Sequence, residues 1–393
     1  MHWASTISRE AAFERAVGEA STQALDALGT RPDLAVVFAS SAWGDELCEL
    51  SELLPAPLRE CTLVGCAAAG VIGGGEECED ASALSLTVAS LPGVTLAARH
   101  VEDESLPSPR ARASAWQTAL GAAAAESGPH FLVLSDPFSF AIESFLQSLD
   151  RHYPDGTKFG GLASGGRRPG DNRLYLNGGV HTSGAVCLAM SGDVEVSAIV
   201  AQGCRPVGQP LFVTRAHGNL LLELDGRRPT DMLRSLYESA DERDRELLPN
   251  ALFLGLVMRP GESTYGPGDY LVRNLVGVDD ESGALWVSAE LEPNQVVQFH
   301  VRDAVTSAED LEQALAPLDR GATPAGALLF SCLGRGQHLY GRPDHDTDAF
   351  RRHAGAVPLG GFFCNGEIGP VRGRTYVHGY TSAFALFHPR TTT

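Results

Sequence analysis

The side chains best suited to chemistry in this 393-residue chain lie in two glycine-flanked motifs near its C-terminus. "FSCLGRG" (330–336) follows an apolar run directly, and "GFFCNGEIGP" (361–370) repeats that design. A thiol beside an arginine could be a nucleophile with a lowered pKa, although cysteine is also a common buried residue. The residues that these motifs present are Cys332, Arg335, Gly336, Cys364, Asn365 and Glu367.

Two further strand-like segments carry charges, "YLVRNLVGVD" (270–279) and "VQFHVRDA" (297–304). Arginines in such apolar segments are usually paired, either with carboxylates or with an anionic ligand. One glutamate and several arginines would suit the amine and the carboxylate of an amino acid. The predicted ligand-binding residues are Arg273, Asn274, Arg302, Asp303, Cys332, Arg335, Gly336, Cys364, Asn365 and Glu367.

Other familiar motifs are missing from the sequence. "HLYGRPDHDTD" (338–348) gathers metal-binding residue types but lacks the spacing and the glycine of an EF-hand, so we predict a solvated loop and no metal site. The eight cysteines form no C-x-x-C pair, and the glycine loops lack the lysine of a P-loop. His300 and His378 are candidate haem ligands, although no C-x-x-C-H attachment motif is present.

A repeated plan underlies these motifs. An apolar run, a helical stretch, a run ending in glycines and an alternating strand recur, beginning at "LAVVFASSAWG", "FLVLSDPFSF" and "GALLFSCLGRG", with a weaker copy from "NALFLGLVMRP". Strands that alternate with helices indicate an α/β or mixed α+β fold. We predict two domains of mixed sheets flanked by helices, with internal pseudo-repeats, and a hairpin turn at residues 216–219.

The repeats change the interpretation of "FSCLGRG". Its counterparts "FASSAWG" and "LSDPFSF" have no cysteine at this point, so the turn itself is architectural. Loops at strand ends are where α/β proteins bind ligands. We therefore predict a strand-end binding loop in which Arg335, rather than a nucleophilic Cys332, carries the function.

The composition limits the classes of partner. A net charge of −19 and a pI near 5.0 disfavour binding to nucleic acid or to anionic membranes. No apolar run approaches the ~18–20 residues of a membrane helix, and the N-terminus reads as an amphipathic helix rather than a signal peptide. We expect reduced cysteines and a cytoplasmic location.

Taken in order, the motifs resemble those of FIST-domain proteins, which pair an N-terminal with a C-terminal FIST region. The resemblance covers almost the whole chain after residue 30. It rests on the four motifs above together with "GCAAAGVI" (65–72), "FGGLASGG" (159–166), "GCRPVGQPLFVTRAHGN" (203–219) and "HGYTSAFALF" (378–387). It implies a FIST N-terminal-like domain at 31–215 and a FIST C-terminal-like domain at 216–393, which follow the N-terminal helix predicted at 1–30.

The resemblance also implies a cytosolic sensory protein that binds a small ligand, with amino acids proposed as ligands for the family. No part of the sequence is left for a transmitter domain, so a separate signalling protein is the expected partner. We predict a binding protein, not an enzyme. Three alternatives stay open: a hydrolase or transferase that uses Cys332 or Cys364, a haem-based gas sensor, and a protein-interaction scaffold.

Overall fold

The computed structural model describes residues 1–262, 264–266 and 268–390, and these form two compact units. The core unit contains Met1–Val200, Glu312–Val377 and residues 381–390. The barrel unit contains Ala201–Leu311 and His378–Tyr380. An α/β fold in two domains is thus confirmed.

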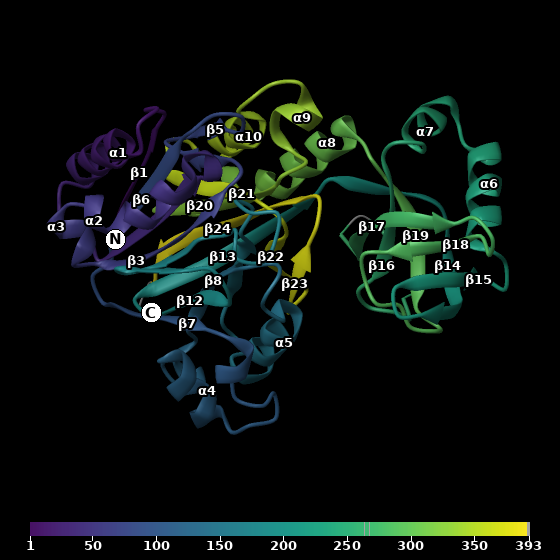
Figure 1. Ribbon diagram of the computed structural model, residues 1–393, viewed down its shortest axis with the longest axis horizontal. Helices are drawn as coiled ribbons and strands as arrows, with labels where there is room; N and C mark the ends of the chain where they lie inside the picture. Colours follow the sequence, from purple (N-terminus) through teal and green to yellow (C-terminus); the bar gives the residue numbers. More distant parts are fainter. Residues whose placement is uncertain (263, 267, 391–393) are drawn as a thin grey trace. The chain divides into compact units, whose positions relative to one another are not determined.

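The core unit consists of three repeats of one plan: strand, helix, strand, helix, strand, hairpin, strand (Figure 1). The first contains β1 (His2–Ser8), α1 (Phe13–Leu28), β2 (Leu34–Ser40), η1 (Ser41–Glu49), α2 (Leu50–Leu53), α3 (Ala56–Arg59), β3 (Thr62–Ala68), β4 (Val71–Gly73), β5 (Glu76–Cys78) and β6 (Leu84–Ser90). The second contains β7 (Val94–Val101), η2 (Asp103–Ser105), α4 (Ala113–Leu120), η3 (Ala125–Ser127), β8 (His130–Ser135), α5 (Ile142–His152), β9 (Lys158–Leu162), β10 (Leu174–Leu176), β11 (Gly179–His181) and β12 (Ala185–Gly192).

The barrel unit interrupts the third repeat after its first strand and also includes residues 201–202, 304–311 and 378 of the elements of this repeat. It contains β13 (Val194–Gln202), α8 (Ala304–Leu315), η4 (Ala316–Asp319), β20 (Gly326–Cys332), α9 (Gly336–Tyr340), α10 (His345–Ala354), β21 (Leu359–Cys364), β22 (Glu367–Val371), β23 (Arg374–His378) and β24 (Thr381–Pro389). In every repeat the second and third strands pair in parallel, as β2–β3, β8–β9 and β20–β21 do, and the last strand pairs antiparallel with the second.

The repeats exchange their hairpins in a closed cycle. Hairpin β4–β5 of the first repeat extends the sheet of the third beside β21, and β10–β11 of the second repeat joins β3 of the first. Hairpin β22–β23 of the third repeat joins β9 of the second. The resulting sheets have the orders β1-β6-β2-β3-β10-β11, β7-β12-β8-β9-β22-β23 and β13-β24-β20-β21-β4-β5.

A glycine at the same point of each repeat allows the parallel strands to approach. An added Cβ at Gly65, Gly160 or Gly361 would lie 1.9, 1.9 or 1.8 Å from a carbonyl oxygen of the neighbouring strand, a distance at which backbone atoms must move. The glycine clusters that mark the repeats in the sequence therefore have a packing role in the sheets.

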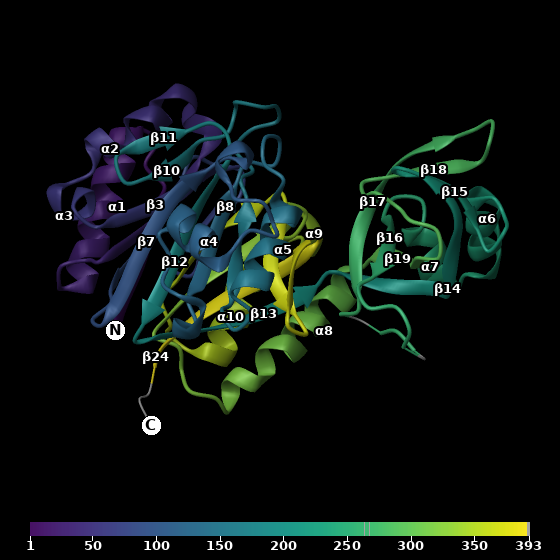
Figure 2. The same cartoon turned by 90° about the horizontal axis from the view of Figure 1, so that it is seen from below.

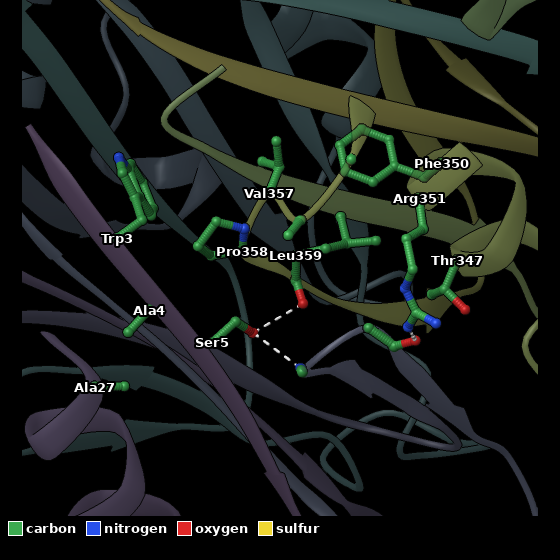
Figure 3. A pocket seen from close by; sticks show the side chains of 14 residues that line it. Trp3, Ala4, Ser5, Ala27, Thr347, Phe350, Arg351, Val357, Pro358 and Leu359 are labelled. Atoms are coloured by element: carbon green, nitrogen blue, oxygen red, sulfur yellow. Dashed lines mark hydrogen bonds between the residues drawn. The ribbon is translucent and has the colours of Figure 1, made fainter. Parts of the chain in front are cut away.

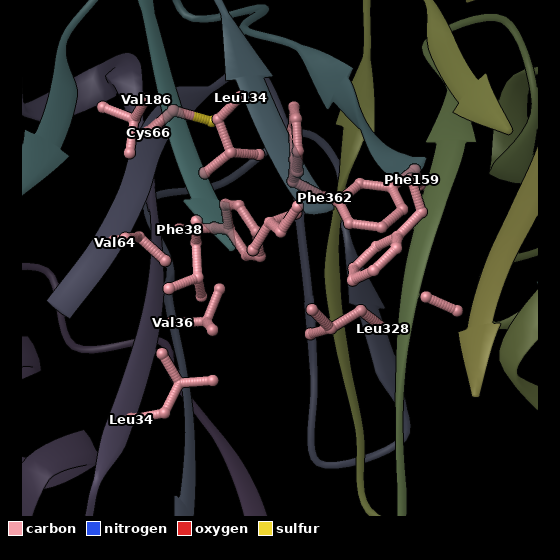
Figure 4. Close-up of a cluster of buried hydrophobic side chains, with 14 of the residues drawn as sticks. Leu34, Val36, Phe38, Val64, Cys66, Leu134, Phe159, Val186, Leu328 and Phe362 are labelled. Carbon is pink, nitrogen blue, oxygen red and sulfur yellow. The ribbon is translucent and has the colours of Figure 1, made fainter. Parts of the chain in front are cut away.

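The three sheets share one apolar core (Figure 4). Phe38 of the first sheet stacks on Phe362 of the third with ring centroids 4.6 Å apart, and Phe159 of the second lies 6.3 Å from Phe330. Helix α1 covers the outer face of the first sheet, while α4 and α5 cover that of the second (Figure 2). Strands buried on both faces explain the continuous apolar runs in the sequence.

The barrel unit is a closed barrel in the order β14-β15-β18-β17-β16-β19, with its own apolar core. The turn after His217 is the predicted hairpin, because His217 pairs with Leu220 and Gly218 has a φ of 59°. The elements of the unit are β14 (Cys204–His217), β15 (Leu220–Leu224), α6 (Pro229–Ser239), α7 (Glu242–Leu247), β16 (Leu252–Val257), β17 (Tyr270–Asp279), β18 (Ala284–Val287) and β19 (Val296–Arg302).

Two expectations about individual elements change. The weaker fourth copy is not a repeat, because β16 and β17 pair antiparallel in the barrel, and no helix lies between them among the described residues 258–262, 264–266, 268 and 269. Within residues 1–30 the helix covers only Phe13–Leu28, since His2–Ser8 form a strand beside β6. The predicted boundary at 215/216 falls inside β14, and the division by family regions stays a prediction. Within the described ranges, no helix is both long and apolar enough to cross a bilayer.

Candidate functional site

A pocket of about 370 Å³ lies in the core unit where strands of two repeats end. Ala69 and Gly70 follow β3, and Phe363 is on β21. The remaining wall comes from the loop after β5 and from the loop and short helix after β20, and consists of Glu79, Asp80, Leu333, Gln337 and His338. We call this cavity the strand-end pocket, and it lies at the carboxyl ends of β3 and β20, where the sequence predicted a crevice.

Glu79 reaches this pocket because of the hairpin exchange. Its Oε1 accepts a hydrogen bond of 2.8 Å from the backbone N–H of Gln337, 258 positions away in the sequence. Gly336 makes room for the carboxylate, since an added Cβ there would lie 2.3 Å from Glu79 Oε1, and Gly336 also has a φ of 63°. Burial raises the pKa of Glu79, and the Gln337 N–H opposes that change. A side chain at position 336 is therefore disfavoured twice, because the backbone has a positive φ and because the Glu79 carboxylate occupies the space of a Cβ.

Arg335 is buried and is not among the residues that line the pocket. Its side chain is 1% exposed and binds Asp346 with two hydrogen bonds, from Nε to Oδ2 at 2.9 Å and from Nη2 to Oδ1 at 3.0 Å. The Tyr340 ring lies 5.5 Å from the guanidinium. Burial disfavours both charges, but the pair holds the pKa of Arg335 above its usual value and that of Asp346 well below. Arg335 thus positions the loop through Asp346.

Asp346 also anchors its surroundings. It accepts hydrogen bonds from the hydroxyls of Ser331 and Ser382, and it lies 3.0 Å from Nδ1 of His345. These contacts join β20, β24 and α10 at one buried carboxylate.

Glu77 is a second buried acid near this network. Its Oε1 accepts a 2.9 Å hydrogen bond from the Thr347 N–H, and Oε2 has no hydrogen-bond partner among the described residues. Burial, followed by repulsion from Asp346, raises the pKa of Glu77 to about 8. Glu77 is therefore largely protonated at neutral pH.

The two cysteines among the predicted site residues are neighbours on the parallel strands β20 and β21. Cys332 is half-buried at the end of β20, one residue before the pocket-lining Leu333, and it accepts a 3.5 Å contact from the Gly334 N–H. Cys364, its neighbour across the parallel pair, is fully buried, and burial raises the pKa of its thiol well above the usual value.

Asn365 and Glu367 hold backbone segments in place. The Asn365 side chain donates to the Ala163 carbonyl of the second repeat at 3.1 Å. Glu367 Oε2 accepts hydrogen bonds from the backbone N–H and the hydroxyl of Thr381, at 3.1 and 2.8 Å. None of these three residues, Cys364, Asn365 and Glu367, is among the lining residues of the strand-end pocket.

Four predicted site residues belong to the barrel unit instead. Asn274 accepts a hydrogen bond from the Tyr380 hydroxyl, and the Arg302 guanidinium lies 5.7 Å from the Tyr380 ring. Arg273 donates to its neighbouring carbonyl at Val272. The structure thus places the ten predicted residues in two units, and none of the ten lines the strand-end pocket, although Cys332 and Gly336 adjoin the lining residues Leu333 and Gln337 in the sequence.

Asp303, the fourth of them, is paired within the barrel unit. It forms ion pairs with Arg205 and Arg243. Burial works against its ionisation, but the Val305 N–H and Arg243 outweigh burial and lower its pKa. Arg205 and Arg243 lie outside the segments 270–279 and 297–304, so the pairing of Arg273 and Arg302 with acids stays a prediction.

The two histidines considered as haem ligands are both buried. His300 is fully buried inside the barrel, with its ring 4.6 Å from that of Tyr270 and Nδ1 on the Gln298 carbonyl. An added Cβ at Gly255 would lie 2.3 Å from the His300 ring, so backbone already packs on its face. The His300 ring therefore has no space beside it for a porphyrin. His378 is 2% exposed.

Sequence reasoning missed Glu79, Asp80, Gln337 and His338. The acids lie in "ECED", which we did not single out, and His338 was assigned to a solvated loop. No sequence pattern could have joined residue 79 to residue 337, because only the hairpin exchange brings them together.

Comparison with known proteins gives a consistent family. A model described as the FIST N domain matches residues 33–227, and one described as the FIST C domain matches residues 229–370. An uncharacterized protein of Mycobacterium tuberculosis is 36% identical over 384 residues, which covers 97% of this chain and 98% of that protein.

Two more distant similarities extend to other organisms. Human F-box only protein 22 is 30% identical over 128 residues, which are 28% of this chain and 32% of that protein. Among solved structures, a cyanuric acid hydrolase from A. caulinodans aligns over 99% of this chain and 100% of its own, with 8% identity and a TM-score of 0.36.

Proposed function

The chain belongs to the FIST family, and from that premise we propose that it is a sensory protein that binds a small amine-bearing molecule, such as an amino acid, in the strand-end pocket. FIST domains are associated with signal transduction and small-ligand sensing. The single observation that supports the location is the pocket itself, formed at strand ends by two repeats. We further propose a cytoplasmic location and a separate signalling protein as the partner.

The charges in the wall favour a cationic group on the ligand. The lining side chains include the carboxylates of Glu79 and Asp80 and no arginine or lysine among the described lining residues. An ammonium group would compensate the partly buried Glu79 carboxylate. The Gln337 amide and the His338 ring can donate hydrogen bonds to a ligand carboxylate, so an amino acid would have partners at both ends.

A path for the signal begins at the same contact. Glu79 holds the first turn of α9 through the Gln337 N–H. Arg335 lies two residues before Gln337 in the chain. A ligand that binds the Glu79 carboxylate would compete with the Gln337 N–H for it. That competition would shift α9 relative to the buried Arg335–Asp346 pair. The surface around α9 is then the region that a partner protein would bind.

Isothermal titration calorimetry with each of the twenty amino acids and with putrescine tests the proposal. We expect saturable heat for at least one amine, and at least ten-fold weaker binding after Glu79→Gln, because a charge-assisted hydrogen bond is lost. Glu76→Gln is the matched control, since Glu76 lies on the same hairpin in an exposed pair with Arg9. No heat with any of these amines, or equal binding by the Glu79 and Glu76 variants, would refute the proposal.

A second candidate function is a thiol-dependent hydrolase or transferase, and the half-buried position of Cys332 beside the pocket wall favours that residue over Cys364. The test is the pH dependence of iodoacetamide labelling at Cys332. A midpoint well below the usual ~8.5 would support a catalytic thiolate, and a midpoint at or above it would argue against one.

A further inference from the structure

A second, larger cavity of the core unit has the features of a binding site for a different kind of molecule. It has a volume of about 470 Å³, within the range of roughly 300–1,000 Å³ that is usual for small-molecule sites. Its wall comes from β1, the turn between β4 and β5, α10 and the loop before β21 (Figure 3). It shares no lining residue with the strand-end pocket.

Most of the cavity wall is hydrocarbon. Trp3 and Ala4 contribute from β1, Phe350 from α10, and Val357, Pro358 and Leu359 from the loop that enters β21. Figure 3 shows these side chains arranged around the space between β1 and α10. Such a wall favours an apolar ligand body.

The floor of the cavity is held in place by Ser5. Its hydroxyl donates to the Leu359 carbonyl at 2.8 Å and accepts from the Gly74 N–H at 3.3 Å, and both contacts are drawn in Figure 3. These two bonds connect β1 with the start of β21 and with the β4–β5 turn. The cavity is therefore preformed, which reduces the entropy lost on binding.

Arg351 is the one charged side chain among the described lining residues. Its Nη2 donates to the Gly75 carbonyl at 2.7 Å, and an added Cβ at Gly75 would lie 2.6 Å from that nitrogen. Figure 3 shows the side chain extending from α10 towards the turn. The absence of a side chain at Gly75 thus lets the guanidinium rest on this turn, at the edge of an apolar cavity.

The acid nearest to Arg351 is mainly engaged elsewhere. Asp348 Oδ1 lies 3.7 Å from Arg351 Nη1, whereas its Oδ2 is 2.8 Å from Nη1 of Arg342. The C-terminus of α10 adds a partial negative charge of roughly half an elementary charge, which the full charge of the guanidinium exceeds. Arg351 therefore retains donors for an incoming anion.

We propose that this cavity binds a small carboxylate with an apolar tail. The carboxylate binds the Arg351 guanidinium, and the tail lies against Val357 and Pro358 between β1 and α10. The inference does not depend on the function proposed for the strand-end pocket, because a different cavity and the opposite ligand charge carry it.

The test is calorimetric titration of the full chain with octanoate, and with 1-octanol as the uncharged probe of equal length. We expect saturable binding of octanoate and at least ten-fold weaker binding of 1-octanol. Arg351→Gln should reduce octanoate affinity by a similar factor. Arg352→Gln is the matched control, since Arg352 is the next residue of α10, pairs with Glu312 and does not line the cavity.

A blocking variant locates the binding. Ala356 is exposed and lines the cavity, so Ala356→Trp should fold normally and abolish the octanoate heat. If Arg351→Gln fails to fold, Arg351→Lys and Ala356→Trp still decide the question. The proposal is overturned by the absence of octanoate binding, by equal affinity for 1-octanol, or by binding that Ala356→Trp leaves intact.

Discussion

Replacing Arg335 by methionine should destabilise the core unit strongly. The side chains of Arg335 and Asp346 are each 1% exposed, so the change removes a buried cation and leaves its carboxylate partner without the opposite charge. Breaking such a pair by removing one partner typically costs about 3–5 kcal/mol, against a total stability of about 5–15 kcal/mol for a domain. We expect a loss of that size for Arg335→Met.

Tryptophan fluorescence during urea unfolding can report on the core unit alone. The chain has four tryptophans, of which Trp3, Trp43 and Trp116 are buried in the core unit and Trp286 is in the barrel. A Trp286→Phe background therefore removes the signal of the barrel unit. The matched control is Arg342→Gln, whose half-exposed pair with Asp348 should contribute about 0–1 kcal/mol.

Two further measurements separate charge from packing. The double variant Arg335→Met/Asp346→Leu should recover much of the loss, because no buried charge is then left. Because the pKa of Asp346 is lowered in the folded state, its contribution is present above its unfolded pKa and disappears as the pH falls through the folded value. The difference in the free energy of unfolding between wild type and Arg335→Met should therefore become smaller at acidic pH. A loss no larger than that of Arg342→Gln, or no recovery in the double variant, would refute this reasoning.

Three other variants test separate features. Gly361→Ala places a Cβ 1.8 Å from the Leu329 carbonyl oxygen, so we expect the thermal midpoint to fall by many degrees or folding to fail. The control is Gly18→Ala in α1, where a Cβ meets nothing within 4 Å, so this variant should be neutral or stabilising. Equal thermal midpoints of the two variants would contradict the packing role of Gly361. His353 bonds two carboxylates, which outweigh burial and raise its pKa, so its contribution is complete below its unfolded pKa and is lost as the pH rises through the folded value; a His353→Gln variant with the same pH profile as the wild type would exclude this. Glu77 has a pKa raised to about 8, so the folded state holds its proton more tightly and stability should fall with pH between about 4.5 and 8; Glu77→Gln should flatten that slope in pH-dependent melting, and an unchanged slope would be evidence against it.

The sequence was sufficient for the fold class and for three of the repeats, because their apolar runs and glycines have local causes. Gly65, Gly160 and Gly361 each lie where parallel strands approach, and a local pattern can reveal such a position. The weaker fourth copy shares the apolar runs, but its two strands pair antiparallel in the barrel, and "MRPGESTYGPGDY" between them is rich in glycine and proline rather than helical in pattern, which was the available sign of another fold.

The site was only partly accessible to sequence reasoning. Arg335 and Gly336 were found because a polar loop directly follows an apolar strand. The sequence did not indicate that Arg335 pairs with Asp346. Asp346 lies in the first turn of α10, and the two side chains meet only in the folded core. Glu79 escaped notice because non-local strand pairing alone brings it to the pocket.

The hairpin exchange has a consequence for how the protein is made. Hairpin β4–β5 leaves the ribosome early, yet its partner strand β21 follows roughly 290 residues later, which at about 5–20 residues per second is on the order of 15–60 seconds. During that interval Val71, Ile72 and Cys78, all buried in the finished fold, have no sheet to join. The first repeat therefore has an exposed apolar hairpin until the third repeat has been synthesised. During that time the hairpin must be kept from pairing with a neighbouring nascent chain.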